Sequence, residues 1–255
     1  LDESMMYSSA MFEHPEQSLT DAQRHRLDVV CQKLDLGPDD HVIEIGTGWG
    51  GFAIHAAQNY GCRVTTTTIS RKQYEKAWLR IEEAGLHDKV ELLFEDYRDL
   101  EGQYDKLISI EMIEAIGSDQ YDTYFKQCGD LLKPGGRMLI QAITIADSQY
   151  EYAQKNVDFI QRYIFPGSCL PSLGVMNETI ARVSNLKVTG VEDIGLDYAL
   201  TLNHWRKNFF GRINEVMEMG FPEEFVWMWE FYLCYCEGGF LEQVISDVQL
   251  VAEKP

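Results

Sequence analysis

Apolar residues along the chain follow two spacings, every second residue in some segments and every third or fourth residue in others. The first spacing is typical of strands and the second of amphipathic helices. Because the two alternate regularly, they predict βαβ units and a mostly parallel sheet. The expected strands are 42–45, 62–68, 89–94, 104–110 and 137–143, with helices at 50–58, 70–84 and 119–132 and a tight turn at 133–136.

The pattern changes after the fifth expected strand. Residues 144–186 are rich in tyrosine and only partly helical. An insertion at this point would lie over the carboxyl ends of the strands, where open α/β sheets bind ligands, so we expect it to form a lid. Further along, the pattern predicts strands at 186–191 and 243–251 and long aromatic-rich helices at 200–219 and 223–236.

The most informative segment is HVIEIGTGWGGF at 41–52, which combines a buried strand, an acid, spaced glycines and a helix start. Glycine lets a strand turn tightly into a helix while the backbone approaches a ligand, and the first N–H groups of the helix supply donors. This segment therefore predicts a nucleotide-type ligand. Gly46, Gly48 and Gly51 also match the G-x-G-x-x-G pattern of dinucleotide sites.

Three interpretations of this glycine turn compete. A nicotinamide site needs a carboxylate about 20 residues further on, whereas the next expected strand ends in VTTTTIS at 64–70, without an acid. Glu44 lies two residues before Gly46, as in the acidic-x-Gly-x-Gly loop of class I S-adenosylmethionine (SAM) methyltransferases. SAM is therefore favoured over NAD, and a glycine-rich turn without a ligand is the third alternative.

The amino-acid composition limits which binding partners are expected. The 22 basic and 41 acidic residues give a net charge of −19, with no basic run, which argues against nucleic acid and against electrostatic docking on an anionic membrane. Six scattered cysteines fit reduced thiols of a cytoplasmic protein, and the histidines lack ligand spacing, so no metal is expected. There is no signal peptide and no apolar run of about 18 residues. The start at Leu1 suggests a fragment of a longer protein.

Several short motifs occur in a fixed order along nearly the whole chain. Together they resemble the cyclopropane fatty-acid synthase family, which includes the mycolic-acid cyclopropane synthases. The motifs are MYSSAMF at 6–12, SLTDAQ at 18–23, IGTGWGG at 45–51, TISRKQ at 68–73, DYRDL at 96–100, EAIG at 114–117, IFPG at 164–167, YALTLNHW at 198–205 and YLCYCE at 232–237.

The resemblance implies a class I SAM-methyltransferase Rossmann-like fold, which is α/β, with a seven-stranded mostly parallel sheet and a helical lid insertion after the fifth strand. The chain would be one catalytic domain, divided into N-terminal cover helices (1–40), a SAM-binding core (41–143), the lid and helices of an acyl pocket (144–186 and 198–236) and a last strand (243–251). Aromatic residues that either line this pocket or form ordinary core are Tyr150, Tyr152, Phe159, Tyr163, Phe165, Trp205, Phe209, Phe210, Trp227, Trp229 and Phe231.

The resemblance also implies which residues contact SAM. Tyr7 and Ser8 lie over the sulfonium and carboxylate end, and the glycine loop 46–51 follows the methionine part. The ribose and adenine are met by Thr68, Ile69, Gln73, Asp96 and Tyr97. Aromatic faces and carboxylates suit a sulfonium cation better than basic side chains do. In chain order the residues are Tyr7, Ser8, Glu44, Gly46, Gly48, Gly50, Gly51, Thr68, Ile69, Gln73, Asp96, Tyr97 and Ile110.

In the family, an alkene attacks the SAM methyl group and a base then takes a proton from the added methyl, in a site that excludes water. The resemblance implies that this base is bicarbonate, held by a cysteine-containing loop, a glutamate, a histidine, a backbone amide and a tyrosine. By position these correspond to Ser9, Glu114, Gln141, Ile143 and Tyr198. A cysteine sometimes proposed as catalytic corresponds to Cys236, although an inert thiol fits its place on an apolar helix face.

Three positions depart from the family pattern. Ser9 replaces the cysteine, Gln141 replaces the histidine, and Ala115 replaces the histidine that usually follows the glutamate. A glutamine cannot become cationic to hold an anion, which puts bicarbonate binding and ring closure in doubt. Two products therefore stay open, a cyclopropane and a methyl or methylene branch, and we favour the branch.

These patterns predict a cytoplasmic SAM-dependent C-methyltransferase acting on the double bond of unsaturated fatty-acyl lipids, with peripheral contact to the inner membrane. The alternatives are a small-molecule methyltransferase for an amine or natural product, a non-catalytic SAM- or lipid-binding homologue, and an NAD-linked oxidoreductase. The oligomeric state stays open, with a dimer as one option.

Overall fold

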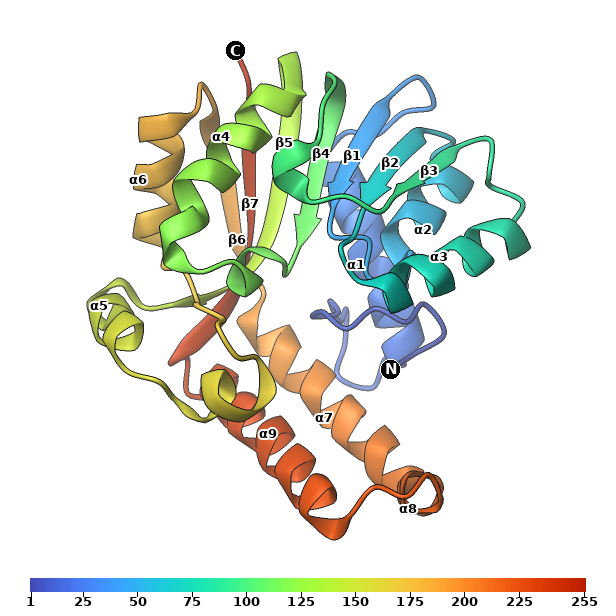
Figure 1. The fold of residues 1–255 in the computed structure, drawn as a ribbon, viewed down its shortest axis with the longest axis vertical. Helices are drawn as coiled ribbons and strands as arrows, with labels where there is room; N and C mark the ends of the chain where they lie inside the picture. Colours follow the sequence, from blue (N-terminus) through green and yellow to red (C-terminus); the bar gives the residue numbers. More distant parts are fainter.

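All 255 residues are described by the structure, a computed structural model. Seven strands form one sheet: β1 (His41–Ile45), β2 (Arg63–Thr67), β3 (Val90–Leu93), β4 (Tyr104–Ile110), β5 (Leu132–Ile145), β6 (Lys187–Asp193) and β7 (Ile245–Glu253). Their order is β3-β2-β1-β4-β5-β7-β6 (Figure 1). The first five strands run parallel, and β7 is antiparallel to both of its neighbours. The predicted seven-stranded, mostly parallel sheet is therefore confirmed.

Nine α-helices accompany the sheet, and most of those predicted are present within a few residues of the expected bounds. Ser70 caps one of them as expected, because its hydroxyl accepts a hydrogen bond from the Gln73 N–H. The helices are α1 (Leu19–Lys33), α2 (Gly51–Asn59), α3 (Arg71–Glu83), α4 (Tyr121–Leu131), α5 (Asp147–Lys155), α6 (Leu173–Val183), α7 (Gly195–Gly211), α8 (Ile213–Glu218) and α9 (Glu223–Leu241). None of them is both long and apolar enough to cross a bilayer.

The sheet is buried on both faces. Val42 packs with the side chains of α1 and α2, whereas the next residue, Ile43, packs with those of α4 and α6. This alternation follows from the two-residue period of a strand and explains why the central strands carry apolar residues on both faces. Rigid cores on both faces fix the positions of the strand ends.

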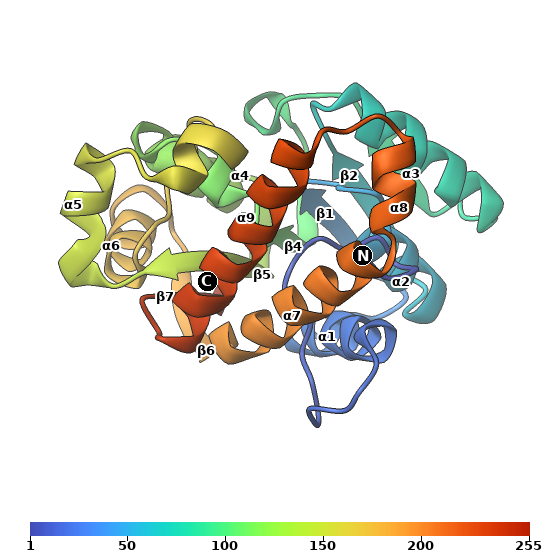
Figure 2. The same cartoon turned by 90° about the horizontal axis from the view of Figure 1, so that it is seen from below.

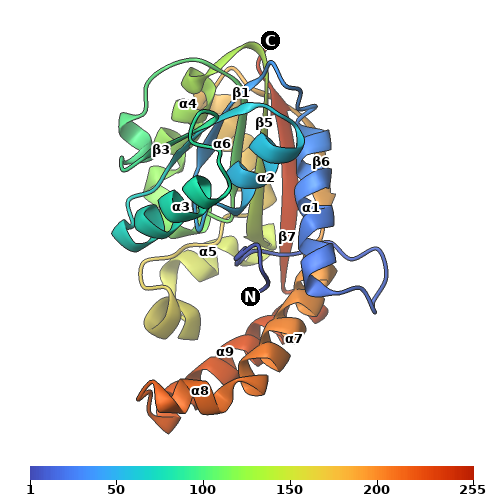
Figure 3. The same ribbon diagram turned by 90° about the vertical axis from the view of Figure 1, so that its right-hand side faces the viewer.

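A separate helical unit lies beyond the carboxyl ends of the parallel strands. Helices α7 and α9 pack on each other and cross in front of the strand ends, and the short helix α8 connects them (Figure 2). In the side view the three helices project past the sheet, while α1 runs alongside it (Figure 3). The N-terminal segment lies between this unit and the sheet, close to the ends of the parallel strands.

Three predicted features need correction. Residues 1–40 hold one helix, α1, and not several cover helices. The segment 133–136 is not a separate turn before the strand, because β5 already begins at Leu132 and these residues form an irregularity within it. It is held in the sheet by Lys254, whose N–H donates to the Gly136 carbonyl at 2.9 Å. The expected helix 200–219 is instead two helices, α7 and α8, that meet at Arg212.

The expected lid at 144–186 is also divided. Helix α5 and the π-helical turn Ile160–Ile164 lie near the strand ends, as predicted. Helix α6 instead packs against α4 on one face of the sheet, where Met176 and Ile180 are fully buried. An apolar face that completes the core stabilises a helix more than exposure over a cavity would. Only the first half of the insertion is therefore placed to cover ligands.

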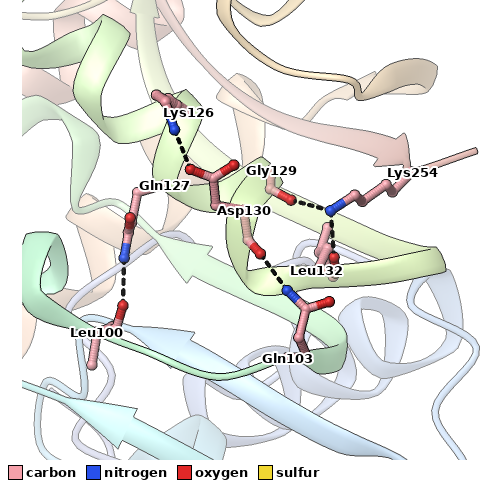
Figure 4. Close-up of polar contacts among 8 residues, drawn as sticks. All are labelled: Leu100, Gln103, Lys126, Gln127, Gly129, Asp130, Leu132 and Lys254. Carbon is pink, nitrogen blue, oxygen red and sulfur yellow. Dashed lines mark hydrogen bonds and ion pairs between the residues drawn. The ribbon is translucent and has the colours of Figure 1, made fainter.

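The carboxyl end of α4 is fastened to distant parts of the chain (Figure 4). The Lys254 ammonium group donates to the carbonyls of Gly129 and Leu132 at 2.8 and 2.7 Å, and Gln103 donates to that of Asp130 at 2.6 Å. Carbonyls in the last turn of a helix have no hydrogen-bond partner within the helix. A cation at this end also interacts favourably with the helix dipole, whose carboxyl end is partially negative. Gln103, directly before β4, and Lys254, directly after β7, thus complete the turn from α4 into β5.

Candidate active site

A cavity with a volume of about 2740 Å³ lies at the carboxyl ends of the parallel strands. It includes Gly46 after β1, Thr68 after β2 and Glu111 after β4. The strand order reverses between β1 and β4, which is where open α/β sheets bind ligands. Pockets for one small ligand measure roughly 300–1,000 Å³. This cavity therefore has room for more than one bound molecule.

The glycine turn forms one end of this cavity. Gly46 and Gly48 have φ values of 102° and 51°, which glycine adopts without strain. The N–H groups of Gly46 and Thr47 both donate to the Thr67 carbonyl, which joins the turn to β2. Glu44 does not line the cavity but lies beneath the turn, where it accepts a 2.6 Å hydrogen bond from the Thr66 hydroxyl. Burial raises the pKa of Glu44 to about 8.

Tyr7 lies directly over the glycine turn. A Cβ atom on Gly48 would stand only 3.3 Å from its ring. Its hydroxyl accepts a 3.0 Å hydrogen bond from the Gln73 amide, whose oxygen in turn accepts one of 2.8 Å from the Thr68 hydroxyl. This chain of hydrogen bonds connects the N-terminal segment to the start of α3. The sequence predicted all three side chains as neighbours of one ligand.

Gly51 is required by the N-terminal segment and not by the cavity. A Cβ atom on Gly51 would stand 2.4 Å from Met6 Sδ and 3.0 Å from the Ser4 carbonyl oxygen. The Arg80 guanidinium holds the same segment, since it donates to the Ser4 and Trp49 carbonyls at 3.0 and 2.6 Å. The segment is thus tied both to α2 and to α3.

The structure brings together most of the predicted cofactor residues but not all of them. Ser8 is turned away, because its hydroxyl accepts a hydrogen bond from Arg26 on α1. Asp96 lines the cavity, but both of its carboxylate oxygens are engaged by Arg98 at 2.8 and 2.7 Å, which lowers the pKa of Asp96. The residues that line the cavity are Tyr7, Gly46, Gly48, Thr68, Ile69, Gln73, Asp96, Tyr97 and Ile110, and those that do not are Ser8, Glu44, Gly50 and Gly51.

Glu114 lines the middle of the cavity, between the glycine turn and the helical unit. One carboxyl oxygen accepts the Ile143 N–H at 2.5 Å, and the other is buried without a partner. Burial, together with the nearby charge of Glu111, raises the pKa of Glu114 to about 8. The predicted glutamate and backbone amide, Glu114 and the Ile143 N–H, are therefore neighbours, but they bind each other and not a separate anion.

Three other predicted catalytic residues converge on one carboxylate that the sequence analysis missed. The side chain of Glu111 accepts the Ser9 N–H at 2.8 Å, the Gln141 amide at 2.9 Å and the Tyr198 hydroxyl at 2.7 Å. Glu111 itself lines the cavity. Its position directly after the buried run of β4, three residues before Glu114, is a signal that could have identified it.

Further buried charges lie behind Glu111. Asp247 on β7 accepts a hydrogen bond from the second hydrogen of the Gln141 amide, at 2.9 Å. Burial and the charges of Glu111 and Glu114 raise the pKa of Asp247 well above its usual value. Arg26 on α1 is fully buried, and burial lowers its pKa while Glu111 and Asp247 oppose this change. Neither Arg26 nor Asp247 carries a sequence signal, because neither of them belongs to a recognisable motif.

The far end of the cavity is apolar. Some of the predicted aromatic residues line it, namely Tyr152, Phe165, Trp205, Phe209 and Trp229, whereas Tyr150, Phe159, Tyr163, Phe210, Trp227 and Phe231 do not. Cys236 also lines it, and burial raises the pKa of its thiol to about 12. A thiol that stays protonated at neutral pH is a poor nucleophile. The geometry therefore favours the inert interpretation of Cys236.

Comparisons with known proteins agree with this architecture. The family model described as mycolic acid cyclopropane synthetase matches residues 1–250. The tuberculostearic acid methyltransferase UfaA1 of Mycobacterium tuberculosis is 38% identical over 264 aligned positions, which cover 100% of this chain and 62% of that protein. The cyclopropane-fatty-acyl-phospholipid synthase of Escherichia coli strain K12 is 38% identical, covering 98% of this chain and 63% of its own length. The chain thus spans less than two thirds of these relatives.

Solved structures give the same result. The mycolic acid cyclopropane synthase CmaA1 complexed with SAH and CTAB has a TM-score of 0.91 at 26% identity, covering 100% of this chain and 92% of that chain. Coclaurine N-methyltransferase has a TM-score of 0.81 at 19% identity, covering 99% of this chain and 76% of that chain. At this identity the comparison shows only that the two folds are similar. The predicted class I SAM-methyltransferase fold is therefore confirmed.

Proposed function

Because the chain belongs to the mycolic acid cyclopropane synthetase family, we propose that it transfers a methyl group from SAM to the double bond of an unsaturated fatty-acyl lipid. The observation that carries this proposal is one continuous cavity with two unlike ends. One end is the glycine turn, and the other is lined by the aromatic residues of α7 and α9. Two glutamates, the half-buried Glu111 and the buried Glu114, line the same cavity.

The residues around the glycine turn fit SAM. When bound, SAM supplies an electrophilic methyl group on a sulfonium cation. The turn offers backbone N–H groups and the ring of Tyr7, which lies against Gly48. Arg98, a basic residue beside Tyr97 at this end, is neutralised by Asp96. Aromatic and acidic neighbours suit a cation, so Tyr7, Thr68, Gln73 and the turn would hold the cofactor.

The opposite end fits an alkyl chain. Its wall includes Trp205, Phe209, Trp229, Leu202 and Leu233, and Leu202 and Leu233 are almost completely buried. A carbocation formed from an alkene reacts with water, so an apolar wall that excludes water protects it. A polar amine substrate would instead require mostly hydrogen-bonding groups at this end, where Lys207 and Asn208 of α7 are outnumbered by apolar side chains. The alkene therefore fits better than the small-molecule alternative.

The residues do not fit bicarbonate as the sequence analysis expected. The N–H of Ile143 is engaged by Glu114, and Glu111 engages the Ser9 N–H, one amide hydrogen of Gln141 and the Tyr198 hydroxyl. The Ser9 hydroxyl donates to the Ala10 carbonyl, and the second amide hydrogen of Gln141 is donated to Asp247. No donor of the expected set is left for a separate anion. We therefore derive no step through bicarbonate.

The first test of the proposed function is direct. The purified protein is incubated with SAM and phospholipids that carry cis double bonds, and the fatty esters are analysed by NMR. A new cyclopropane or methylene signal with release of S-adenosylhomocysteine is the expected result. NMR is required because ring and methylene products add the same mass. Tight binding of SAM without any change in the lipid would instead support a non-catalytic SAM-binding protein.

Gly51→Ala is expected to weaken SAM binding roughly tenfold, or about 1.4 kcal/mol. The added methyl group would overlap Met6 and so displace the N-terminal segment, and Tyr7 would move with it. Calorimetric titration with SAM measures the effect. Gly190→Ala is a matched control, since a Cβ atom there meets nothing within 4 Å. Unchanged affinity in Gly51→Ala would show that this segment does not cover the cofactor.

A further inference from the structure

The hydrogen bonds around Glu111 indicate a catalytic role that the resemblance did not suggest. We propose that the Glu111 carboxylate is the general base of this enzyme and occupies the place expected for a bicarbonate ion. This inference rests on the proposed methyl transfer to an alkene. It deepens that proposal by naming the group that takes the proton.

The first argument is the arrangement of donors. The groups implied by position as ligands of an anion include Ser9, Gln141 and Tyr198. All three donate to the two oxygens of Glu111, at 2.7 to 2.9 Å. Three donors that converge on a carboxylate stabilise its charged form and fix its orientation. The anion cradle is thus present, and a side chain of the protein fills it.

The second argument is electrostatic. Glu111, Glu114, Asp247 and the single buried cation Arg26 belong to one charge cluster. Burial raises the pKa of both Glu114 and Asp247, which favours their neutral forms near pH 7. Burial raises the pKa of Glu111 as well, but the Tyr198 and Ser9 donors and the charge of Arg26 act in the opposite direction. Because Glu111 alone of the three acids receives three donors, it is the best placed of them to carry the negative charge. A second anion beside it would have no cation to balance it.

The third argument is backbone conformation. Glu111 has a φ of 48°, a left-handed conformation that costs a residue other than glycine roughly 1–2 kcal/mol. Its N–H nevertheless donates to the Gln141 carbonyl at 2.8 Å, which holds the end of β4 against β5. Strain of this kind persists at functional sites because the surroundings impose it. Here it turns the carboxylate toward the donors at the edge of the cavity.

The reaction balances with this base. The π electron pair of the alkene forms a bond to the methyl carbon, the C–S bond breaks with its pair left on sulfur, and the second alkene carbon becomes cationic. Glu111 then takes one proton of the new methyl group. The released C–H pair either closes a ring onto the cationic carbon or, after a hydride shift from the methylated carbon, forms a methylene double bond. Glu111 ends as a neutral acid that returns its proton to water.

The decisive experiment compares two substitutions of one residue. Glu111→Gln keeps the shape but cannot accept a proton, and we expect kcat to fall by about 10²–10⁴ with unchanged SAM affinity. Glu111→Gly removes the carboxylate, relieves the positive φ and frees the three donors. Added bicarbonate should then restore turnover in Glu111→Gly, while wild-type turnover should not respond to it. Glu91→Gln, on the surface of β3 and away from the cavity, is the control.

A second readout does not depend on activity. Bicarbonate should raise the melting temperature of Glu111→Gly by a few degrees relative to chloride at equal ionic strength, and it should leave wild type unchanged. The proposal is wrong if wild-type turnover requires bicarbonate, if Glu111→Gly works at the wild-type rate without it, or if bicarbonate does not bind this variant. If wild type binds SAM but alters no lipid, the proposed function fails, while the melting test still decides whether the cradle holds an anion.

Discussion

Arg26→Met is expected to lower the free energy of unfolding by about 3–5 kcal/mol at pH 8. The guanidinium of Arg26 is completely buried and donates to the Ser8 hydroxyl and the Gln23 side-chain oxygen. It is also the buried cation that balances Glu111. Methionine fills similar volume, but it leaves the Glu111 carboxylate uncompensated in a region of low dielectric constant. Urea unfolding monitored by circular dichroism measures the loss.

The same substitution should be less damaging at pH 5. Glu111 can take up a proton there and become neutral, which removes the unpaired charge. Arg24→Met on the same helix is the matched control, because Arg24 is exposed and pairs only with Asp21 on the surface. Exposed pairs of this kind contribute at most about 1 kcal/mol. Equal losses for Arg26→Met and Arg24→Met, or a loss independent of pH, would contradict the charge balance proposed for the site.

Glu44→Gln is expected to make the protein more stable at pH 8 and to leave it nearly unchanged at pH 5. In the folded state the pKa of Glu44 is raised to about 8 by burial, whereas in the unfolded chain it is close to its ordinary value. Between these values the folded protein retains a proton that the unfolded chain releases. Stability from this group is therefore complete below about pH 4 and is lost as the pH rises toward 8, at up to about 1.4 kcal/mol per pH unit.

The amide of Glu44→Gln does not titrate, and it can still accept the hydrogen bond of Thr66. We expect the stability advantage of the variant over wild type to grow by roughly 3 kcal/mol between pH 5 and pH 8. Urea unfolding at several pH values measures this difference. Glu91→Gln is again the control, since Glu91 is exposed on β3. A constant difference across the pH range would mean that Glu44 is already ionised in the folded protein.

Sequence reasoning succeeded where one local pattern determines one local structure. The run VIEIGTGWGG has a strand period, glycines at positions with positive φ and a helix start, and each of these features appears in the structure. Ser70 was identified as a helix cap for the same reason. That Tyr7 and Gln73 lie together near the turn could be predicted because the motif that carries each of them is short and specific.

The charge cluster could not be predicted in the same way. Its members come from α1, the end of β4 and β7, so that Arg26, Glu111 and Asp247 are brought together only by the tertiary fold. Burial, which decides their pKa values, is likewise a property of the folded protein. Ser9 and Gln141 were recognised as unusual, but the reason lies in the partner that they share, Glu111. A substitution pattern indicates that a site has changed, whereas coordinates show what has replaced the missing group.

The place of β7 in the sheet has a consequence for biosynthesis. This strand, residues 245–253, is inserted between β5 and β6 and pairs with both of them. Until it emerges from the ribosome, the nascent chain exposes two unpaired strand edges, which are templates for aggregation. Asp247 and Lys254 belong to this part of the chain, so the buried acid beside Gln141 and the contacts that fasten the end of α4 also form only after β7 has been synthesised. Substitutions that weaken the pairing of β7 would expose the same two edges in the finished protein and favour aggregation.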